Sequence, residues 1–158
     1  MMMISMTTTT SKAATIDFEL VDMNNQARPT YKSADHKNAV FVLEFYQYNC
    51  GPCQSNAVNI HKLYDEYKDY LRVQILDVGI DPSDSLYQQW IARQSPKYPV
   101  LNDGRRSLSR KISLEATPTT LVVDCNMNEI HRIVGTWEAA DAAKVRELIE
   151  QQLQVVCQ

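Results

Sequence analysis

The sequence lacks several features that would define other classes of protein. No apolar stretch reaches the roughly 18 residues that a membrane-spanning helix needs, so no membrane span is expected in this chain. Only four cysteines occur in 158 residues, which is too few for a scaffold held together by disulfides. With only four glycines, the chain also has no glycine-rich loop of the kind that binds phosphate groups.

Basic residues are neither numerous nor clustered. The 16 Lys and Arg residues are outnumbered by 19 Asp and Glu residues, and the formal net charge is −3. Nucleic-acid-binding domains usually present a concentrated basic surface, so no nucleic-acid partner is expected. The chain is 44% hydrophobic and 22% charged, which is typical of a globular domain long enough to bury a core.

The first fifteen residues, MMMISMTTTTSKAAT, differ in composition from the rest of the chain. Their apolar segment is too short for a secretory signal, and no basic residues precede it. We therefore expect a disordered leader or a cloning remnant at residues 1–15, one domain at 16–154 and a short tail at 155–158.

Strand and helix patterns alternate along the domain. Residues 39–46 (AVFVLEFY) are rich in β-branched and aromatic residues and predict a strand buried on both faces. The other predicted strands are 16–23, 73–78, 119–124 and 130–134. The predicted helices are 51–71, 81–94, 107–112 and 139–154. Residues 24–38 are polar and predict an irregular segment. This order predicts an α/β domain with a central mixed sheet and helices on both faces.

Apolar residues three or four positions apart define the inner faces of the helices. For the helix at 51–71 the predicted inner residues are Ile60, Leu63, Tyr67 and Leu71. For the helix at 81–94 they are Leu86, Trp90 and Ile91.

The motif Cys50-Gly51-Pro52-Cys53 lies between the buried strand and the first long helix. A cysteine at a helix start meets unpaired backbone N–H groups and the positive end of the helix dipole, and both stabilise a thiolate. Such motifs commonly lower the cysteine pKa from about 8.5 toward about 7. We therefore predict that Cys50 is the attacking sulfur and that Cys53, one turn into the helix, resolves the mixed disulfide.

Two neighbouring residues suit that chemistry. Pro52 fits the first helical turn, where its missing N–H costs nothing, and Gly51 leaves room for a partner chain. A zinc site is the alternative use of the same thiols, but a closed zinc site needs two further ligands. Cys125, Cys157, His61 and His131 do not show the required spacing.

Glu44 stands in the middle of the apolar strand, six residues before Cys50. Burial there would raise the pKa of its carboxyl, and the group could take a proton from Cys53 and return it. Exposure of Glu44 at a strand end is the alternative. Thr117 and Pro118 precede the strand at 119–124, where the sequence alone favours a trans proline.

These residues resemble the thioredoxin superfamily, and more closely the TlpA-like redoxins. The resemblance runs from about residue 16 to residue 153. It is carried by FELVDMNNQ, VFVLEFYQYNCGPC, VGIDPSDSLYQQWIARQSPKYPVLND and ISLEATPTTLVVDCNMNEIHRIVG. It implies a thioredoxin fold with an N-terminal hairpin and a mid-chain insert.

The resemblance also assigns roles to single residues. It implies a cis bond at Pro118, backbone hydrogen bonds from Thr117 to a bound thiol partner, and a buried acidic group at Glu44. Gly51, Pro52, Thr117 and Pro118 are therefore the expected substrate-binding residues. Asn49 departs from the family, which usually has tryptophan before the first cysteine; asparagine can instead cap the helix.

The sequence thus predicts a thiol–disulfide oxidoreductase that reduces disulfides in protein partners. It needs no cofactor, receives electrons from a partner protein and is expected to be a monomer. A copper or zinc chaperone using the same thiolates is the alternative. A peroxiredoxin-type peroxidase is disfavoured, because Tyr48 and Asn49 replace the threonine and its neighbours that precede the peroxidatic cysteine.

The resemblance implies an extracytoplasmic or periplasmic location, since TlpA-like proteins generally work outside the cytoplasm; a cytoplasmic location is the alternative. The two remaining cysteines lie in a predicted turn (Cys125) and in the tail (Cys157). We predict that they are unpaired accessory thiols, with a second disulfide as the alternative.

Overall fold

Strand β3 occupies the centre of the fold, and all seven of its residues are buried. The computed structural model describes residues 4–6 and 15–157. In it, β3 pairs in parallel with β4 and antiparallel with β6, and the strand order is β5-β4-β3-β6-β7. The strands of this sheet are β3 (Val40–Tyr46), β4 (Val73–Gly79), β5 (Val100–Asn102), β6 (Thr119–Val123) and β7 (Glu129–Val134). The predicted α/β class with a mixed sheet is confirmed.

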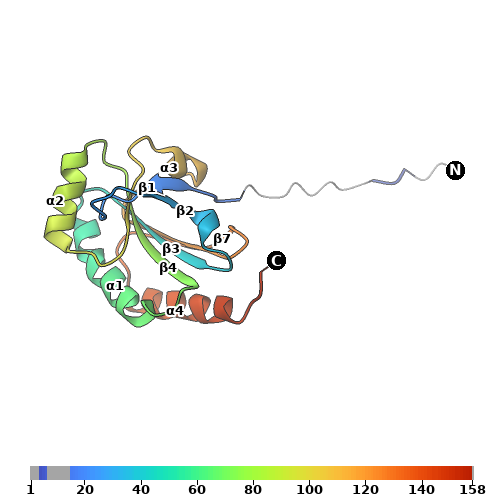
Figure 1. The fold of residues 1–158 in the computed structure, drawn as a ribbon. Coiled ribbons are helices and arrows are strands. Elements are labelled where there is room, and N and C mark those ends of the chain that lie inside the picture. The colour runs from blue at the N-terminus through green and yellow to red at the C-terminus, as the bar shows by residue number, and fades with distance from the viewer. Residues whose placement is uncertain (1–3, 7–14, 158) are drawn as a thin grey trace.

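Helices cover both faces of this sheet (Figure 1). The helices are α1 (Gly51–Tyr67), α2 (Asp84–Gln94), α3 (Ser107–Lys111) and α4 (Ala139–Leu153). Helices α1 and α4 pack on one face, where β3 contributes Val40 and Val42. Helix α3 and an N-terminal hairpin cover the other face, where β3 contributes Phe41, Leu43 and Phe45. Side chains of a strand alternate between the two faces of a sheet, and here both are covered, so this strand has an almost continuous apolar sequence.

The N-terminal hairpin and strand β5 differ from the elements expected from the sequence. The strand expected over 16–23 is only β1 (Glu19–Val21), and it pairs with β2 (Thr30–Lys32) inside the segment expected to be irregular. A short 3-10 helix (Ser33–Asp35) follows β2. Strand β5 was not predicted, because a three-residue strand carries almost no periodic signal. The hairpin itself agrees with the family resemblance.

Two predicted inner faces also need correction. Helix α1 ends at Tyr67, so Leu71 lies beyond it and is 89% exposed instead of facing the core. In α2 the fully buried residues are Tyr87 and Trp90, whereas Leu86 is only half-buried. Burial of Tyr87 leaves its hydroxyl paired, because the carbonyl oxygens of Gly79 and Asp81 both lie 2.8 Å away and its single proton can be donated to either.

A second disulfide joins Cys125 to Cys157, so the prediction that these residues are unpaired thiols is wrong. Cys125 follows β6 in the turn before β7, and Cys157 follows α4. Their Cα atoms are 5.8 Å apart, a normal separation for a disulfide. The residues are 32 positions apart in the sequence and meet only because the turn and the chain end lie at the same end of the sheet.

Arg72 fixes the same end of α4. Its guanidinium donates hydrogen bonds to three carbonyl groups at the end of the helix and just after it: Gln152 at 3.2 Å, Leu153 at 3.1 Å and Val155 at 2.7 Å. A cation is favourable at a helix C-terminus, where unpaired carbonyl groups carry partial negative charge. In Figure 1 this end of the molecule is at the right, whereas α1 and α2 lie at the left.

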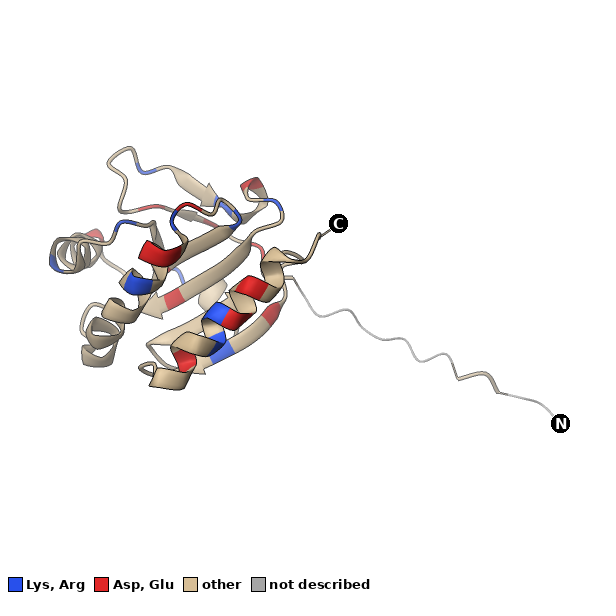
Figure 2. Ribbon diagram, turned by 90° about the horizontal axis from the view of Figure 1, so that it is seen from below, with Lys and Arg blue, Asp and Glu red and all other residues tan. Residues whose placement is uncertain are grey.

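Charged residues of both signs are interspersed along α4 (Figure 2). One cross-helix ion pair joins Arg146 of α4 to Glu66 of α1. Among the described residues, no helix is long and apolar enough to cross a bilayer. The leader predicted at residues 1–15 lies mostly outside the described residues.

Candidate active site

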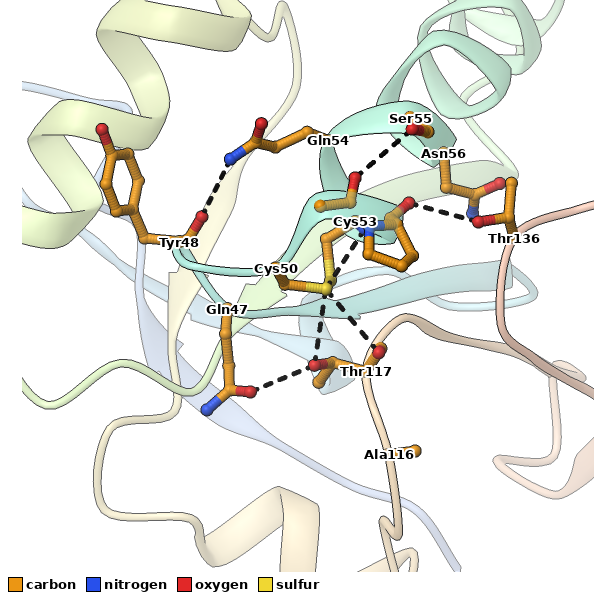
Figure 3. The surroundings of a disulfide bond; sticks show 12 residues. Gln47, Tyr48, Cys50, Cys53, Gln54, Ser55, Asn56, Ala116, Thr117 and Thr136 are labelled. Atoms are coloured by element: carbon orange, nitrogen blue, oxygen red, sulfur yellow. Dashed lines mark hydrogen bonds between the residues drawn. A yellow bond between two sulfur atoms is a disulfide. The ribbon is translucent and has the colours of Figure 1, made fainter.

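Helix α1 begins at the dithiol motif (Figure 3). Cys50 is the N-cap residue, and its Sγ accepts a hydrogen bond from the backbone N–H of Cys53 at 3.2 Å. Cys50 and Cys53 form a disulfide, with their Cα atoms 5.2 Å apart. Asn49 is exposed and does not cap the helix. The free N–H groups of the first turn therefore surround Cys50, where they favour the thiolate once the disulfide is reduced.

The two sulfur-bearing residues differ in accessibility. Cys50 is 9% exposed and Cys53 only 2% exposed. Gly51 and Pro52 between them are exposed, and a Cβ atom added at Gly51 would meet no other atom within 4 Å. A partner disulfide can therefore approach Cys50 from the side of these two residues, while Cys53 is shielded inside the first turn.

The loop before β6 closes the other side of the dithiol. The Thr117–Pro118 peptide bond is cis, as the resemblance implies and contrary to the trans form favoured by the sequence alone. The carbonyl oxygen of Thr117 is 3.6 Å from Cys50 Sγ, and its Oγ1 is 3.8 Å from the same sulfur. Thr117 Oγ1 also donates a hydrogen bond to Gln47 Oε1 at 3.1 Å. The structure thus brings Thr117 and Pro118 against Cys50, 67 positions away in the sequence.

Glu44 is buried, as expected, and is only 3% exposed. Its Oε1 accepts a hydrogen bond from Asn56 Nδ2 at 2.9 Å, and its Oε2 accepts one from Thr120 Oγ1 at 2.6 Å. Burial raises the pKa of the Glu44 carboxyl to about 7, although the hydrogen bonds from Thr120 and Asn56 lower it. A carboxyl with this pKa changes its charge near neutral pH, which suits a group that exchanges a proton.

Asn56 links Glu44 to the helix that carries the dithiol. It follows Cys53 by three residues on α1, and residues at this spacing share one face of a helix. The carboxyl that Asn56 binds therefore lies beneath the same face as Cys53. Asn56 also accepts a hydrogen bond from the backbone N–H of Trp137 at 3.0 Å, and Trp137 Nε1 donates to Thr120 Oγ1 at 2.7 Å.

These hydrogen-bonding residues were not identified from the sequence. Asn56 and Thr120 are both 0% exposed, yet each lies in a segment whose pattern predicts only a helix or a strand. Trp137 lies in the segment between β7 and α4. A polar residue on the apolar face of a predicted helix, such as Asn56, is a detectable signal, whereas threonine is common in strands and carries none.

In the part of the chain that the structure describes, metal-ligand candidates do not gather around the dithiol. Among residues 4–6 and 15–157, no group of three or more His, Cys, Asp or Glu side chains has the arrangement to hold a metal ion. Cys125 and Cys157 are paired with each other at the far end of β6. The two sulfurs of Cys50 and Cys53 would therefore supply only half of a closed tetrahedral zinc site.

A mixed sheet, a C-x-x-C disulfide at the start of the first long helix and a cis-proline loop beside it define a thioredoxin-fold protein with a redox-type dithiol site. Comparison with known proteins agrees. The chain belongs to the AhpC/TSA family, whose family model matches residues 11–130.

Several curated relatives are thiol-disulfide oxidoreductases by name. ResA of Oceanobacillus iheyensis is 27% identical over 119 residues, which cover 75% of this chain and 61% of that protein. ResA of Geobacillus kaustophilus is 24% identical over 134 residues, covering 85% of this chain and 75% of that protein. This chain therefore spans about three fifths of the length of the first of these relatives.

Solved structures share the fold. The thiol:disulfide interchange protein DsbE from Chlorobium tepidum superposes with a TM-score of 0.77 at 22% identity, covering 92% of this chain and 99% of that one. A thiol-disulfide oxidoreductase from Bacteroides fragilis gives a TM-score of 0.73 at 17% identity, covering 87% of this chain and 99% of that one. A disulfide oxidoreductase described as secreted by Mycobacterium tuberculosis gives 0.68 at 12% identity, covering 89% of this chain and 97% of that one. The thioredoxin fold implied by the resemblance is confirmed.

Proposed function

We propose that this protein is a thiol–disulfide oxidoreductase that reduces disulfides in partner proteins. The observation that carries the proposal is the disulfide at the N-terminus of α1 between Cys50, which is 9% exposed, and the more deeply buried Cys53, which is 2% exposed. The names of the curated relatives support the same reaction class.

Cys50 performs the first step. In the reduced protein its thiolate attacks one sulfur of the partner disulfide, forms a mixed disulfide and releases the other sulfur as a thiolate. The partner chain lies over the exposed Gly51 and Pro52 and reaches the edge of the Thr117–Pro118 loop, which borders Cys50. The backbone of Thr117 is close enough to Cys50 Sγ to bind the chain that carries the attacked sulfur.

Cys53 and Glu44 perform the second step. Cys53 loses its proton to the Glu44 carboxylate, directly or through one water, and its thiolate attacks Cys50 of the mixed disulfide. The partner leaves with its second sulfur reduced, and Cys50 and Cys53 become a disulfide. Electrons then return from a partner protein by the reverse exchange, so no bound cofactor takes part.

The second disulfide supports a location for the protein, and the dithiol chemistry supports a class of partner. We place the protein outside the cytoplasm, because its second disulfide is remote from the dithiol and disulfides of this kind persist mainly in oxidising compartments. The proposed substrates are protein disulfides, the electron donor is a protein thiol, and the working unit is a monomer.

The direction of the reaction is tested by the reduction potential of the Cys50–Cys53 pair. For a reductase we expect a value near that of thioredoxin, about −270 mV. The measurement is equilibration with glutathione buffers, followed by quantification of the oxidised fraction. The Cys125→Ser/Cys157→Ser variant is the control, since it reports the active-site pair alone. A potential near the −120 mV or so of a strong oxidant would contradict a reductase and make the protein a disulfide donor.

The role of Glu44 is tested by Glu44→Gln. We expect the rate of the Cys53-dependent step to rise with pH through about 7 in the wild type, as the Glu44 carboxyl ionises. The variant should lose this inflection and react about 100-fold more slowly at neutral pH, the usual loss when a general base is removed. Stopped-flow fluorescence of a mixed-disulfide substrate follows the step. An unchanged inflection in Glu44→Gln would assign the proton to another group.

The same variant has an effect on stability with a defined sign. The folded-state pKa of Glu44 is raised, so its contribution to stability is fully present below the ordinary value of 4.5 and is lost as the pH rises through about 7. This difference in pKa corresponds to about 3 kcal/mol of unfolding free energy. The stability of the wild type against urea should therefore fall over this pH range. In Glu44→Gln the fall should be smaller by about this amount, and the part that remains comes from the buried Asp77.

A further inference from the structure

Glu44 shares one rung of the sheet with a second buried carboxyl. The register of the sheet sets Glu44 of β3 directly opposite Asp77 of β4 on one side and Thr120 of β6 on the other. Residues opposite each other on neighbouring strands point to the same face. Asp77 is 1% exposed, so two carboxyl groups stand side by side in the protein interior.

Within the described part of the chain, no cation forms an ion pair with either carboxyl, that of Glu44 or that of Asp77. The polar groups that interact electrostatically with the Asp77 carboxyl are those of Glu44, Tyr46, Tyr98 and Trp90, and none of them is a cation. Helix α1 contributes the uncharged Asn56 to Glu44. Two adjacent carboxylates at low dielectric without a counter-ion cannot both ionise near neutral pH. The pair therefore holds at least one proton under working conditions.

The hydrogen bonds to the two carboxyls indicate which of them keeps the shared proton. Glu44 accepts two strong hydrogen bonds, one on each oxygen, from Asn56 and Thr120. Asp77 accepts one, from Trp90 Nε1 at 2.9 Å. The buried hydroxyl of Tyr98 is near enough to affect the pKa of Asp77, but it makes no hydrogen bond to it in the structure. Hydrogen-bond donors stabilise the ionised form of a carboxyl group. Glu44 therefore ionises more readily than Asp77, and Asp77 keeps its proton more readily than Glu44.

The pKa values point the same way. Burial raises the pKa of the Asp77 carboxyl well above its ordinary value, and the neighbouring Glu44 charge raises it further. For Glu44 the pKa rises only to about 7. As the pH increases, Glu44 therefore loses its proton first, and its negative charge then holds the proton on Asp77.

We propose that Asp77 stays a neutral carboxylic acid throughout the reaction and is a positioning residue that leaves Glu44 free to exchange its proton. The inference rests on the proposed role of Glu44. When Cys53 gives its proton to the Glu44 carboxylate, the Cys53 S–H bond breaks, a Glu44 O–H bond forms and Asp77 keeps its own proton. Both carboxyls are then neutral beside the new disulfide. An ionised Asp77 would hold Glu44 protonated and so remove the proton acceptor.

Asp77 also anchors part of the wall around the dithiol. The Trp90 ring that donates to it stacks on Tyr46, with ring centroids 4.0 Å apart. Both rings belong to the apolar cluster that contains Cys50 and Cys53. A variant of Asp77 must therefore keep an acceptor for Trp90 if its effect on protonation is to be separated from an effect on packing.

Infrared spectroscopy of the wild-type protein tests the proposal directly. Exposed carboxyls have a pKa of about 4, so well above pH 7 they are ionised and give no carbonyl band of a protonated acid. We expect one such band to persist there, to shift when aspartate is labelled with carbon-13, and to remain when only glutamate is labelled. The absence of a protonated band, or a shift with labelled glutamate, would overturn the proposal. This readout needs no variant.

Asp77→Asn gives the functional test, since asparagine imitates a protonated aspartate and can still accept from Trp90. If Asp77 is neutral in the wild type, Asp77→Asn should leave the acid dissociation constant of Glu44, read from the pH profile of the Cys53 step, within about threefold of the wild-type value. The infrared band should vanish in this variant. If Asp77 is ionised, removing its charge should increase that constant about tenfold or more.

Glu44→Gln separates the two proposals. It should retain the aspartate band while losing the pH inflection. If the inflection survives in Glu44→Gln, the proposed role of Glu44 fails, whereas the band alone still decides the protonation of Asp77.

Discussion

Replacing Cys50 by serine should abolish the reduction of protein disulfides, with a loss of at least about a thousandfold. A serine hydroxyl is not ionised at neutral pH, so the N–H groups at the start of α1 would have no anion to stabilise. Insulin reduction by a suitable electron donor, followed by turbidity, measures the effect. Because Cys53 is more deeply buried than Cys50, we expect that it does not replace Cys50 as the nucleophile.

Cys53→Ser is the matched control for this result. It keeps the attacking sulfur but removes the one that resolves the intermediate, so a mixed disulfide between Cys50 and the partner should accumulate. Mass spectrometry after acid quenching detects the covalent complex. Persistent insulin reduction by Cys50→Ser, or an equal yield of complex through position 53, would show that the roles of the two sulfurs have been assigned wrongly.

Removing the second disulfide should lower stability while sparing activity. Cys125 and Cys157 are 32 positions apart, and opening a loop of this length releases chain entropy worth about 4 kcal/mol in the unfolded state. For a chain of this size that corresponds to a fall in melting temperature of roughly 10 °C. Activity should remain, because Cys125 lies beyond the end of β6 opposite to the Thr117 loop.

The measurement is urea unfolding of Cys125→Ser/Cys157→Ser. The comparison is cleanest in a background that also carries Cys50→Ser and Cys53→Ser, where added reductant acts on the Cys125–Cys157 disulfide alone. In that background reduction should reproduce the loss caused by the serine variant. Equal unfolding midpoints with and without reductant would mean that this disulfide does not constrain the folded chain.

Much of the fold was predictable because its signals are local. The apolar run at β3 and the three-to-four spacing in α1 and α4 require only neighbouring residues, and each predicted element was found. The short strands β2 and β5 were not predicted, because each has only three residues and too little local pattern. They form by pairing with other segments of the chain. Leu71 was misplaced because periodicity continues past the point where the chain leaves the helix.

The candidate site divides in a similar way. The dithiol was predictable, since a C-x-x-C motif at a strand-to-helix junction contains both sulfurs and the helix start within four residues. Glu44 was predictable as a carboxylate in an apolar strand. Asp77 carries the same signal in VQILDV, yet its importance comes from standing beside Glu44, which depends on the register of two strands 33 positions apart.

The sequence alone therefore determined the reacting sulfurs and the elements that carry them, because a helix start acts on a cysteine within its own first turn. Only the tertiary structure decided the proton environment: the Asp77–Glu44–Thr120 rung, the Asn56 and Trp90 donors, and the Thr117 loop against Cys50. It also decided the pairing of Cys125 with Cys157. Such contacts join segments far apart in the chain, so strand register and helix docking set them, and no local pattern encodes either.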